Sequence, residues 1–359
     1  MPVIVVDDDK VLRFLHVLLD PGVPPDRAAA LTDFLSFDIA DVGTWMDNVR
    51  VSCGALYPAS VRMVPDQDSL HAALPEADAV VVEGLAVGEA ELARSAGLKL
   101  VQKFGVDSRN IDLDACARAG ISVRTVRRRV NGAVAEHAIA LMMAVGRKIC
   151  ETEGALDFSS LRALGYKPAL FDANHISGAN WARIHGLKSL QGATLGALGL
   201  GEVGREVAPR ARAMGMEVLY YQRNRLPSEI EAESNAQYVS FEELLERSDF
   251  LSVHLPLTPE TEGMIDAAAF ACLKPGAILV NVSRAHIVDR GALIEALNSG
   301  HLGGAGLDVH YQEPGDADEP LKSYPNVVLS PHIAVASRTH AIADMEAVVS
   351  NLAEAFRTR

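Results

Sequence analysis

Short apolar runs alternate along this chain with amphipathic stretches, and the pattern predicts parallel strands separated by helices. In the first part of the chain it predicts strands at 2–6, 61–64, 79–82, 98–104 and 121–123. The helices predicted between them lie at 10–19, 27–37, 69–74, 89–96 and 112–119. Residues 38–60 show no clear period, so no element is predicted there.

The same alternation returns in the second part of the chain. It predicts strands at 217–221, 250–255, 277–282, 304–309 and 326–329, and helices at 240–248, 266–273 and 291–299. A long apolar helix over 131–147 connects the two parts, and residues 151–190 are expected to form loops and short helices. We expect a final helix over 337–357 to return to the first part, because its apolar residues share one face: Ile342, Met345, Val349, Leu352 and Phe356.

A glycine-rich turn lies between an apolar run and a helix-like segment, with the sequence Gly199-Leu200-Gly201-Glu202-Val203-Gly204. In such a strand–turn–helix unit, Gly199 allows the turn, Gly201 lets a pyrophosphate approach the backbone, and Gly204 lets helix and strand pack closely. Unpaired N–H groups at the helix N-terminus then hold the phosphates. The pattern alone is weak, but the elements on both sides of it predict a dinucleotide site.

Composition narrows the classes of function. Apolar residues make up 49% of the 359 residues, and the formal net charge of -14 argues against a nucleic-acid or anionic-membrane partner. The four cysteines are scattered, so we expect reduced thiols and no metal site. The N-terminus is unlike a signal peptide, and Glu136 and His137 interrupt the most apolar long segment. We therefore expect a cytoplasmic protein with no membrane span.

Three further motifs follow the glycine-rich turn in order. They are LVNVSRAHIVD at 279–289, GLDVHYQEP at 306–314 and SPHIA at 330–334. Together with the turn they closely resemble the D-isomer-specific 2-hydroxyacid dehydrogenase family, with glyoxylate and hydroxypyruvate reductases as the nearest type. The resemblance extends from about residue 77 to residue 334 and includes AVAEHA at 133–138 and HLPLTPET at 254–261. As a set in this order, the motifs are highly specific.

The alternation and the resemblance together predict an α/β protein. It should contain two Rossmann-like or flavodoxin-like parallel-sheet domains with an active-site cleft between them. Residues 1–130 and 333–359 are assigned to a discontinuous substrate domain, and residues 131–332 to a dinucleotide-binding Rossmann domain. The resemblance also implies a homodimer formed through the region of the connecting helix.

The chemistry of 2-keto acid reduction explains why three charged residues of these motifs belong together. The reaction needs a cation for the carboxylate, a proton for the nascent alkoxide and a hydride from nicotinamide. Arg284 offers a planar fork that binds a carboxylate and polarises the adjacent carbonyl. A histidine such as His332 can exchange the hydroxyl proton, and Glu313 can bond its other ring nitrogen and favour the protonated ring. The resemblance implies these three catalytic roles.

Taken singly, each of these residues also has a structural interpretation. An arginine after a strand usually lies at the surface, an E-P dipeptide is usually a turn, and a histidine beside proline is more often structural than catalytic. Composition does not select His332 among the 11 histidines. The ordered set of motifs favours the catalytic interpretation of Arg284, Glu313 and His332.

The resemblance further assigns residues to the cofactor. Asp308 matches the position that contacts the nicotinamide carboxamide, although it could simply end a strand. The loop that begins at His254 matches one that lines the cofactor, although His254 could also be a satisfied buried histidine. The predicted cofactor-binding residues are Gly199, Gly201, Glu202, Val203, Gly204, Gln222, Arg223, Arg225, His254, Leu255, Pro256, Thr261, Ser283 and Asp308.

The cofactor type is indicated by the end of the second strand of this domain. An acidic residue about 20 positions after the glycine-rich turn normally binds the ribose hydroxyls of NAD. This chain has Gln222 there, followed by Arg223 and Arg225, and either arginine could pair with a 2′-phosphate. We therefore predict that NADP(H) is favoured and NAD(H) possible. The alternative is that Gln222 bonds an ordinary ribose and both arginines are solvated.

Two segments of the first domain differ from the family pattern or add charge to it. The loop Gly105-Val106-Asp107-Ser108-Arg109 resembles the substrate loop, in which backbone N–H groups hold the substrate carboxylate, so Val106 and Asp107 are predicted to bind substrate. Asp107 is unexpected beside an anion unless it points away or pairs with Arg109. Arg124 and residues 127–129 could bind a second acidic group of the substrate, or form a solvated or subunit-facing patch.

Other functions are weighed against the reductase. A cofactor-sensing corepressor of the same fold is the main alternative, and the complete Arg284–Glu313–His332 set argues against it. Oxidation of another small anion, such as phosphite, is compatible with the motifs, whereas formate enzymes usually have Gln in place of Glu313. We do not expect a 3-phosphoglycerate dehydrogenase with a regulatory tail, because the chain ends at Arg359.

Overall fold

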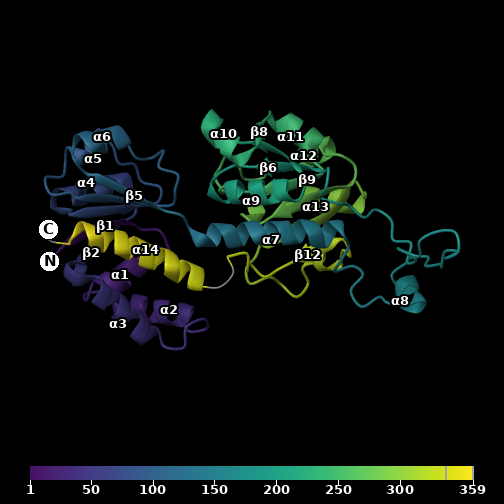
Figure 1. Ribbon diagram of the computed structural model, residues 1–359, viewed down its shortest axis with the longest axis horizontal. Helices are drawn as coiled ribbons and strands as arrows, with labels where there is room; N and C mark the ends of the chain where they lie inside the picture. The colour runs from purple at the N-terminus through teal and green to yellow at the C-terminus, as the bar shows by residue number, and fades with distance from the viewer. Residues whose placement is uncertain (336–337, 358–359) are drawn as a thin grey trace. The chain divides into compact units, whose positions relative to one another are not determined.

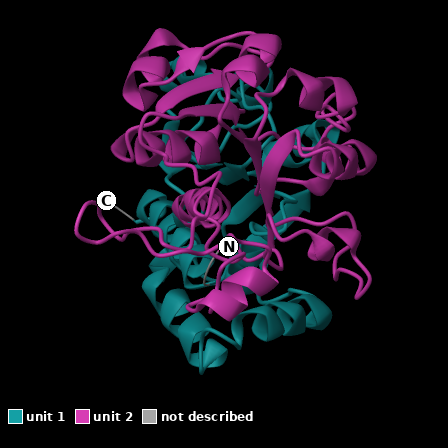
Figure 2. Ribbon diagram, turned by 90° about the vertical axis from the view of Figure 1, so that its right-hand side faces the viewer, with its two compact units in different colours: residues 1–130, 336–359 teal, residues 131–335 magenta. Residues whose placement is uncertain are grey.

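Two parallel sheets organise the chain, each inside its own unit (Figure 1). The computed structural model describes residues 1–335 and 338–357. Unit 1 comprises Met1–Val130 and Ala336–Arg359, and unit 2 comprises Asn131–Val335 (Figure 2). The two units, each a parallel α/β layer structure, confirm the predicted fold class. The second boundary lies after residue 335, whereas the sequence placed it after residue 332.

The sheet of unit 1 has the strand order β2-β1-β3-β4-β5, the flavodoxin-like order of a doubly wound sheet, and every pair of neighbours is parallel. Its strands are β1 (Val3–Asp7), β2 (Ser60–Val64), β3 (Ala79–Val82), β4 (Leu100–Phe104) and β5 (Ser122–Val126). Its helices are α1 (Arg13–Leu19), α2 (Pro25–Leu35), α3 (Val42–Ser52), α4 (Gln67–Ala73), α5 (Glu89–Leu92), α6 (Leu113–Arg118) and α14 (Thr339–Ala355).

The last helix, α14, belongs to the core of unit 1. Met345 and Leu352 are fully buried and share a hydrophobic cluster with Ile4 of β1 and Phe104 of β4. The predicted apolar face is therefore the buried one. Residue 337, where this helix was predicted to begin, lies outside the described residues.

Helix α3 was not predicted, although residues 42–52 form three regular turns. Asp41 caps it, because the carboxylate accepts a hydrogen bond of 2.9 Å from the backbone N–H of Thr44. Only Val42 and Val49 are buried on this helix, and the other side chains are exposed or half-buried. The weak amphipathic pattern reflects this shallow packing.

The sheet of unit 2 has the order β12-β11-β10-β9-β6-β7-β8, again with parallel neighbours throughout. Its strands are β6 (Thr194–Leu198), β7 (Glu217–Tyr221), β8 (Gln237–Tyr238), β9 (Phe250–Val253), β10 (Ala277–Asn281), β11 (Leu302–Leu307) and β12 (Val327–Leu329). Its helices are α7 (Arg129–Gly146), α8 (Phe158–Ala163), α9 (Glu202–Ala213), α10 (Ser228–Ser234), α11 (Phe241–Arg247), α12 (Ala267–Cys272) and α13 (Arg290–Asn298). Helix α10 and the short strand β8 were not predicted.

The strands of unit 2 are apolar on both faces because helices cover both faces. Along β10, Ile278 and Val280 enter the cluster on one side of the sheet, and Leu279 enters the cluster on the other. Continuous apolar runs therefore mark these strands in the sequence. Chain order reverses between β6 and its neighbour β9, and ligands of such sheets bind at the carboxyl ends of the strands beside this switch point.

Two observations concern the expectations about membranes and metals. Across the part of the chain that the structure describes, no helix is both long enough and apolar enough to cross a membrane. Within the same residues there is no cluster of three or more histidine, cysteine, aspartate or glutamate side chains that could hold a metal ion. The four cysteines are free: Cys53, Cys116, Cys150 and Cys272.

Candidate functional site

The glycine-rich turn joins β6 to α9 at the switch point of the unit 2 sheet. Gly199 has a φ of +99°, and a Cβ there would lie 3.0 Å from the carbonyl carbon and oxygen of His254. A Cβ on Gly204 would lie 2.4 Å from the carbonyl oxygen of Gly199, so the helix could not approach the strand with any larger residue. A Cβ on Gly201 would meet nothing within 4 Å. The turn is thus tightly packed at Gly199 and Gly204, and it has open space beside Gly201.

The side chains next to the turn brace its backbone. Gln222 accepts a hydrogen bond of 3.0 Å from the backbone N–H of Leu200 and donates one of 2.7 Å to the carbonyl of Asn224. Glu202, in the first turn of α9, accepts a hydrogen bond of 2.8 Å from Asn131, and Val203 is half-buried beside it. Gln222 therefore couples the end of β7 to the glycine-rich turn.

The two arginines after β7 have different surroundings. Arg225 forms a bidentate pair with Glu231, with both nitrogen–oxygen distances 2.8 Å, and its guanidinium lies 5.5 Å from the ring centre of Tyr238. Hydrogen bonds from Arg225 and Tyr220 lower the pKa of Glu231 to about 2. Arg223 is exposed. Both arginines are exposed, but the charge of Arg225 is paired with the carboxylate of Glu231.

The predicted cofactor loop after β9 is closed by its own hydrogen bonds. Thr261 donates to the carbonyl of Pro256 at 2.7 Å and accepts from the backbone N–H of Thr258 at 2.8 Å. Ser283 donates through its hydroxyl to the carbonyl of Leu255. The side chains of Thr261 and Ser283 therefore shape the loop that was predicted to line the cofactor.

His254 at the start of this loop carries unsatisfied polar atoms. Both of its ring nitrogens are buried and neither has a hydrogen-bond partner among the described residues. Burial lowers the pKa of His254 to about 4, so the ring is neutral at pH 7. An orphaned buried imidazole beside Gly199 is an unusual cost for a folded chain, and it fits a site that is completed by a bound group.

The three predicted catalytic residues follow the carboxyl ends of neighbouring strands β10, β11 and β12. The backbone N–H of Asp308 donates to the carbonyl of Asn281 at 3.0 Å, which ties the end of β11 to that of β10. The backbone N–H of Ser330 donates to the carbonyl of Leu307 at 3.0 Å, which ties β12 to β11. The structure thereby brings the loops of Arg284, Glu313 and His332 to one edge of the sheet.

Arg284 is presented by a short turn that Asn281 supports. The buried Asn281 side chain donates to the carbonyl of Arg284 at 2.9 Å and accepts from the backbone N–H of Ser283 at 3.0 Å. The guanidinium is exposed and donates to the carbonyl of Ser283 at 2.7 Å. It forms no ion pair with any carboxylate in the residues described, so it is free to bind an anion.

Glu313 and His332 form the predicted pair. Nδ1 of His332 lies 2.7 Å from a carboxylate oxygen of Glu313, and the other carboxylate oxygen accepts from the backbone N–H of His310 at 3.0 Å. Burial by itself would raise the pKa of Glu313, but the hydrogen bonds from His332 and His310 outweigh it and hold the pKa below its usual value. Glu313 is therefore ionised at neutral pH, and Nε2 is the ring nitrogen of His332 left for a ligand.

Asp308, predicted to contact the cofactor, is bonded to the loop that carries His332. It is fully buried, and its carboxylate accepts hydrogen bonds from Ser330 Oγ at 2.6 Å, from the N–H of Ile333 at 2.9 Å and from the N–H of Ala334 at 2.8 Å. These donors lie on both sides of His332. Both carboxylate oxygens are therefore engaged in holding the histidine loop.

Four residues that surround these side chains were not predicted as site residues: Asn281, Ser330, His310 and His137. All four stand inside the recognised motifs, so their places in the motifs were the available signal. Asn281 precedes Arg284 by three residues, and the turn that joins them is visible only in the structure. His137 on α7 was expected to be structural, and its Nε2 lies 2.8 Å from Ser330 Oγ.

The predicted substrate loop lies in unit 1. Asp107 forms a bidentate pair with Arg109, whose Nε lies 2.8 and 2.9 Å from the two carboxylate oxygens, and Val106 is exposed. The arginine cluster that follows has partners as well. Arg124 pairs with Glu354 at 3.5 Å, Arg129 pairs with Asp344 at 3.6 Å, and Arg128 lies 4.4 Å from the ring centre of Phe104.

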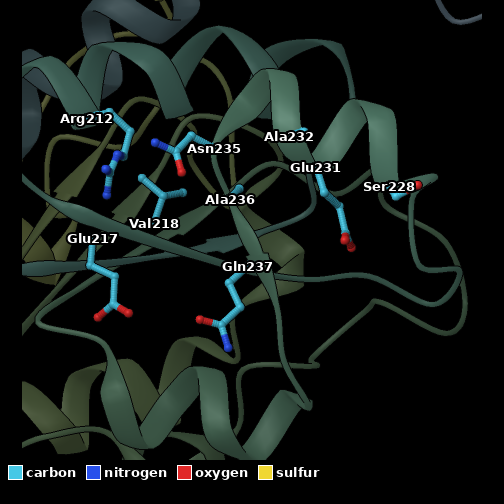
Figure 3. Close-up of a pocket in the computed structure, with 9 residues that line it drawn as sticks. All are labelled: Arg212, Glu217, Val218, Ser228, Glu231, Ala232, Asn235, Ala236 and Gln237. Carbon is cyan, nitrogen blue, oxygen red and sulfur yellow. The ribbon is translucent and has the colours of Figure 1, made fainter.

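A hollow of about 460 Å³ lies beside the first residues of β7, between α10 and the end of α9 (Figure 3). Its polar side chains are engaged inside unit 2, since Arg212 donates to the carbonyl of Met216 and Glu217 accepts from Arg247. Glu231 on its wall is the partner of Arg225. None of the residues predicted for catalysis lines this hollow, so it is separate from the site described above.

Comparison with known proteins matches this arrangement to one family. Residues 166–334 match the model of the D-isomer specific 2-hydroxyacid dehydrogenase, NAD binding domain. Over 291 residues the chain is 38% identical to the glyoxylate reductase of Thermococcus litoralis, a match that covers 80% of this chain and 83% of that protein. The chain belongs to the D-isomer specific 2-hydroxyacid dehydrogenase family.

Other members of the family show the range of this similarity. The chain is 40% identical over 274 residues to the D-3-phosphoglycerate dehydrogenase of Mycobacterium leprae. This match covers 76% of this chain and 48% of that protein. It thus spans about half the length of the D-3-phosphoglycerate dehydrogenases that it matches. The crystal structure of a glyoxylate reductase from Paecilomyes thermophila superimposes with a TM-score of 0.54 at 26% identity, covering 99% of this chain and 95% of that chain.

The packing of the turn can be tested at Gly201 and Gly204, which differ in the space around a Cβ atom. We expect Gly204→Ala to lower the free energy of unfolding by about 1–3 kcal/mol, because its Cβ would collide with the backbone at Gly199. Gly201→Ala is the control, and it should change this free energy by less than about 0.5 kcal/mol because its Cβ meets open space. Urea unfolding of both variants measures the difference. If both variants lost the same free energy of unfolding, the close approach of Gly204 to Gly199 would not be what excludes a larger residue there.

Proposed function

We propose that this protein is a nicotinamide-dependent oxidoreductase that interconverts a 2-keto acid and its D-2-hydroxy acid. The proposal rests chiefly on one observation, the 2.7 Å hydrogen bond between His332 and the ionised Glu313 on the sheet edge that also carries Arg284. Membership of the family and the 38% identity to a glyoxylate reductase support it.

Each of the three residues has one task in the proposed reaction. Arg284, with its unpaired and exposed guanidinium, binds the carboxylate of the keto acid and polarises the neighbouring carbonyl. A reduced nicotinamide, when bound, supplies the hydride that the carbonyl carbon receives. His332 gives the proton on Nε2 to the carbonyl oxygen, which becomes the hydroxyl group. Glu313 fixes the ring through Nδ1.

The turn and the loops of unit 2 fit the binding of a dinucleotide. The open space above Gly201 and the first N–H groups of α9 suit a pyrophosphate. The orphaned nitrogens of His254 lie on the loop after β9, next to the switch point. We assign cofactor contacts to these groups and to Leu255 and Pro256. Asp308 acts on the histidine loop.

We also propose that Val106 and Asp107 in the loop after β4 bind the substrate. The bidentate pair with Arg109 neutralises the carboxylate of Asp107, so this carboxylate does not repel a substrate anion. We place the protein in the cytoplasm, as expected from its scattered free cysteines.

Activity is tested with a spectrophotometric screen of 2-keto acids in the presence of NADPH and of NADH. We expect reduction of at least one keto acid, and His332→Ala should lower kcat by at least about 100-fold because the proton donor is lost. Glu313→Gln should also lower kcat, because a neutral amide no longer holds the ring of His332 through a charge-assisted hydrogen bond. No reduction of any 2-keto acid, or full activity in His332→Ala, would refute the proposed reaction.

We further propose that NADP(H) is favoured over NAD(H), and that Arg223 is the residue that binds the 2′-phosphate. Gln222 brings no negative charge to this position, and Arg225 is already paired with Glu231. Arg223→Ala should lower the ratio of kcat/KM for NADPH to that for NADH by about 10-fold, the effect of one charge-assisted hydrogen bond. Arg225→Ala is the matched control and should leave this ratio nearly unchanged. A strong preference of the unchanged protein for NADH would overturn the assignment.

A homodimer is the third part of the proposal. Residues 147–187 of unit 2 extend beyond its sheet around α8 (Figure 1), and Leu156, Leu170 and Ile176 expose most of their surface there. We propose that a second copy of this chain covers these three side chains. Sedimentation velocity should give twice the mass of one chain, and Leu170→Asp should shift the protein toward the monomer. Exclusive monomers at micromolar concentration would contradict a dimer.

A further inference from the structure

The backbone at His332 is held in an unusual conformation. Its φ of +55° lies in the left-handed region, which residues other than glycine rarely occupy unless their surroundings stabilise it. The residue at this strained position carries the proton in the proposed reaction. The contacts that hold the turn should therefore control where Nε2 points.

We propose that His310, Ser330 and His137 are positioning residues that act with Asp308 to hold His332 in this left-handed turn. The inference rests on the proposed role of His332 as proton donor. None of these three side chains needs to touch substrate or cofactor for the inference to hold. Their function is to hold the histidine loop against the loop of Glu313.

The first part of the network lies beneath the turn. Asp308 accepts hydrogen bonds from the N–H groups of Ile333 and Ala334 after His332, and from Ser330 Oγ before it. The backbone N–H of His332 itself donates to the carbonyl of Ser330 at 2.9 Å. One buried carboxylate thus fixes the backbone on both sides of the turn.

The protons in this part of the network can be assigned from the partners. A carboxylate oxygen only accepts, so the hydroxyl hydrogen of Ser330 points to Asp308, 2.6 Å away. Ser330 Oγ can then only accept from His137, whose Nε2 lies 2.8 Å away and must carry the hydrogen. His137 therefore fixes the hydroxyl rotamer of Ser330, and Ser330 orients the carboxylate of Asp308.

The second part of the network joins the histidine loop to the glutamate loop. Nε2 of His310 lies 2.8 Å from the carbonyl oxygen of Ser330, and a carbonyl only accepts, so this nitrogen carries a hydrogen. The backbone N–H of His310 donates to Glu313 at 3.0 Å, and Glu313 bonds His332. His310 thus connects the two loops: its side chain bonds the backbone beside His332, and its backbone N–H bonds the carboxylate that orients the ring of His332.

Loss of either link should affect turnover more than binding. A shift of about 1 Å in a reacting group lowers the rate by about 100-fold when binding is otherwise intact. We expect His310→Ala and Ser330→Ala to lower kcat by about 10- to 100-fold while KM for the keto acid and the cofactor changes less than about threefold. His310→Gln should restore most of kcat, because its side-chain amide keeps an N–H donor within reach of the Ser330 carbonyl.

The matched control is His301→Ala. His301 also places Nε2 near a backbone carbonyl, that of Leu273 at 2.9 Å, but it lies at the opposite end of β11. This variant should keep kcat unchanged. Urea unfolding should show all four variants folded, and Ser330→Ala tests the same network from another strand if His310→Ala proves unstable.

A second readout needs no turnover. The hydrogen-bonded imidazole N–H between His332 and Glu313 should give a downfield proton NMR resonance, assigned by its loss in His332→Ala. We expect this resonance to broaden or disappear in His310→Ala and Ser330→Ala and to remain in His301→Ala. If the protein reduced no keto acid, the proposed function would fail while this resonance would still decide the positioning role. An unchanged resonance in both variants, unchanged kcat, or a loss confined to KM would overturn the inference.

Discussion

Helices cover both faces of the unit 2 sheet, so a ligand cannot reach either face. Ligands of such sheets bind at the carboxyl ends of the strands. The glycine-rich turn after β6, the loop of His254 after β9, Arg284 after β10, Glu313 after β11 and His332 after β12 all lie at these ends. Backbone hydrogen bonds between neighbouring strand ends fix the spacing of these loops. The order of the strands therefore places the side chains of the proposed reaction next to one another.

Buried polar groups then determine how each loop is held. Asn281 supports the turn of Arg284, and Asp308 fixes the backbone around His332 from beneath. A fully buried carboxylate is costly unless its oxygens are satisfied, and at Asp308 they are, by two backbone N–H groups and the hydroxyl of Ser330. Buried hydrogen-bonded side chains therefore support the exposed groups of the site, which are Arg284 and the His332–Glu313 pair.

Sequence reasoning recovered the parts that depend on periodicity and on glycine. Strands such as β10 are continuous apolar runs because both faces are covered, and Gly199 and Gly204 stand where a Cβ would collide with backbone. Helix α3 was missed although Val42, Trp45, Met46 and Val49 have helical spacing, because most of its surface is exposed. The direction of side chains could not be predicted: the pairing of Arg225 with Glu231, and the inward orientation of Asp308, depend on contacts between elements distant in the chain or on rotamers that one sequence does not encode.

The central claim is transfer of a hydride to the carbonyl carbon of a 2-keto acid with protonation from His332. It is tested most directly with NADPH or NADH carrying deuterium in place of the transferable hydrogen at C4 of the nicotinamide, followed by chiral separation and mass spectrometry of the product. We expect one deuterium at C2 of the D-2-hydroxy acid, formed at least about 100-fold more slowly by His332→Ala. A product of the L configuration, or one without deuterium at C2, would contradict the claim.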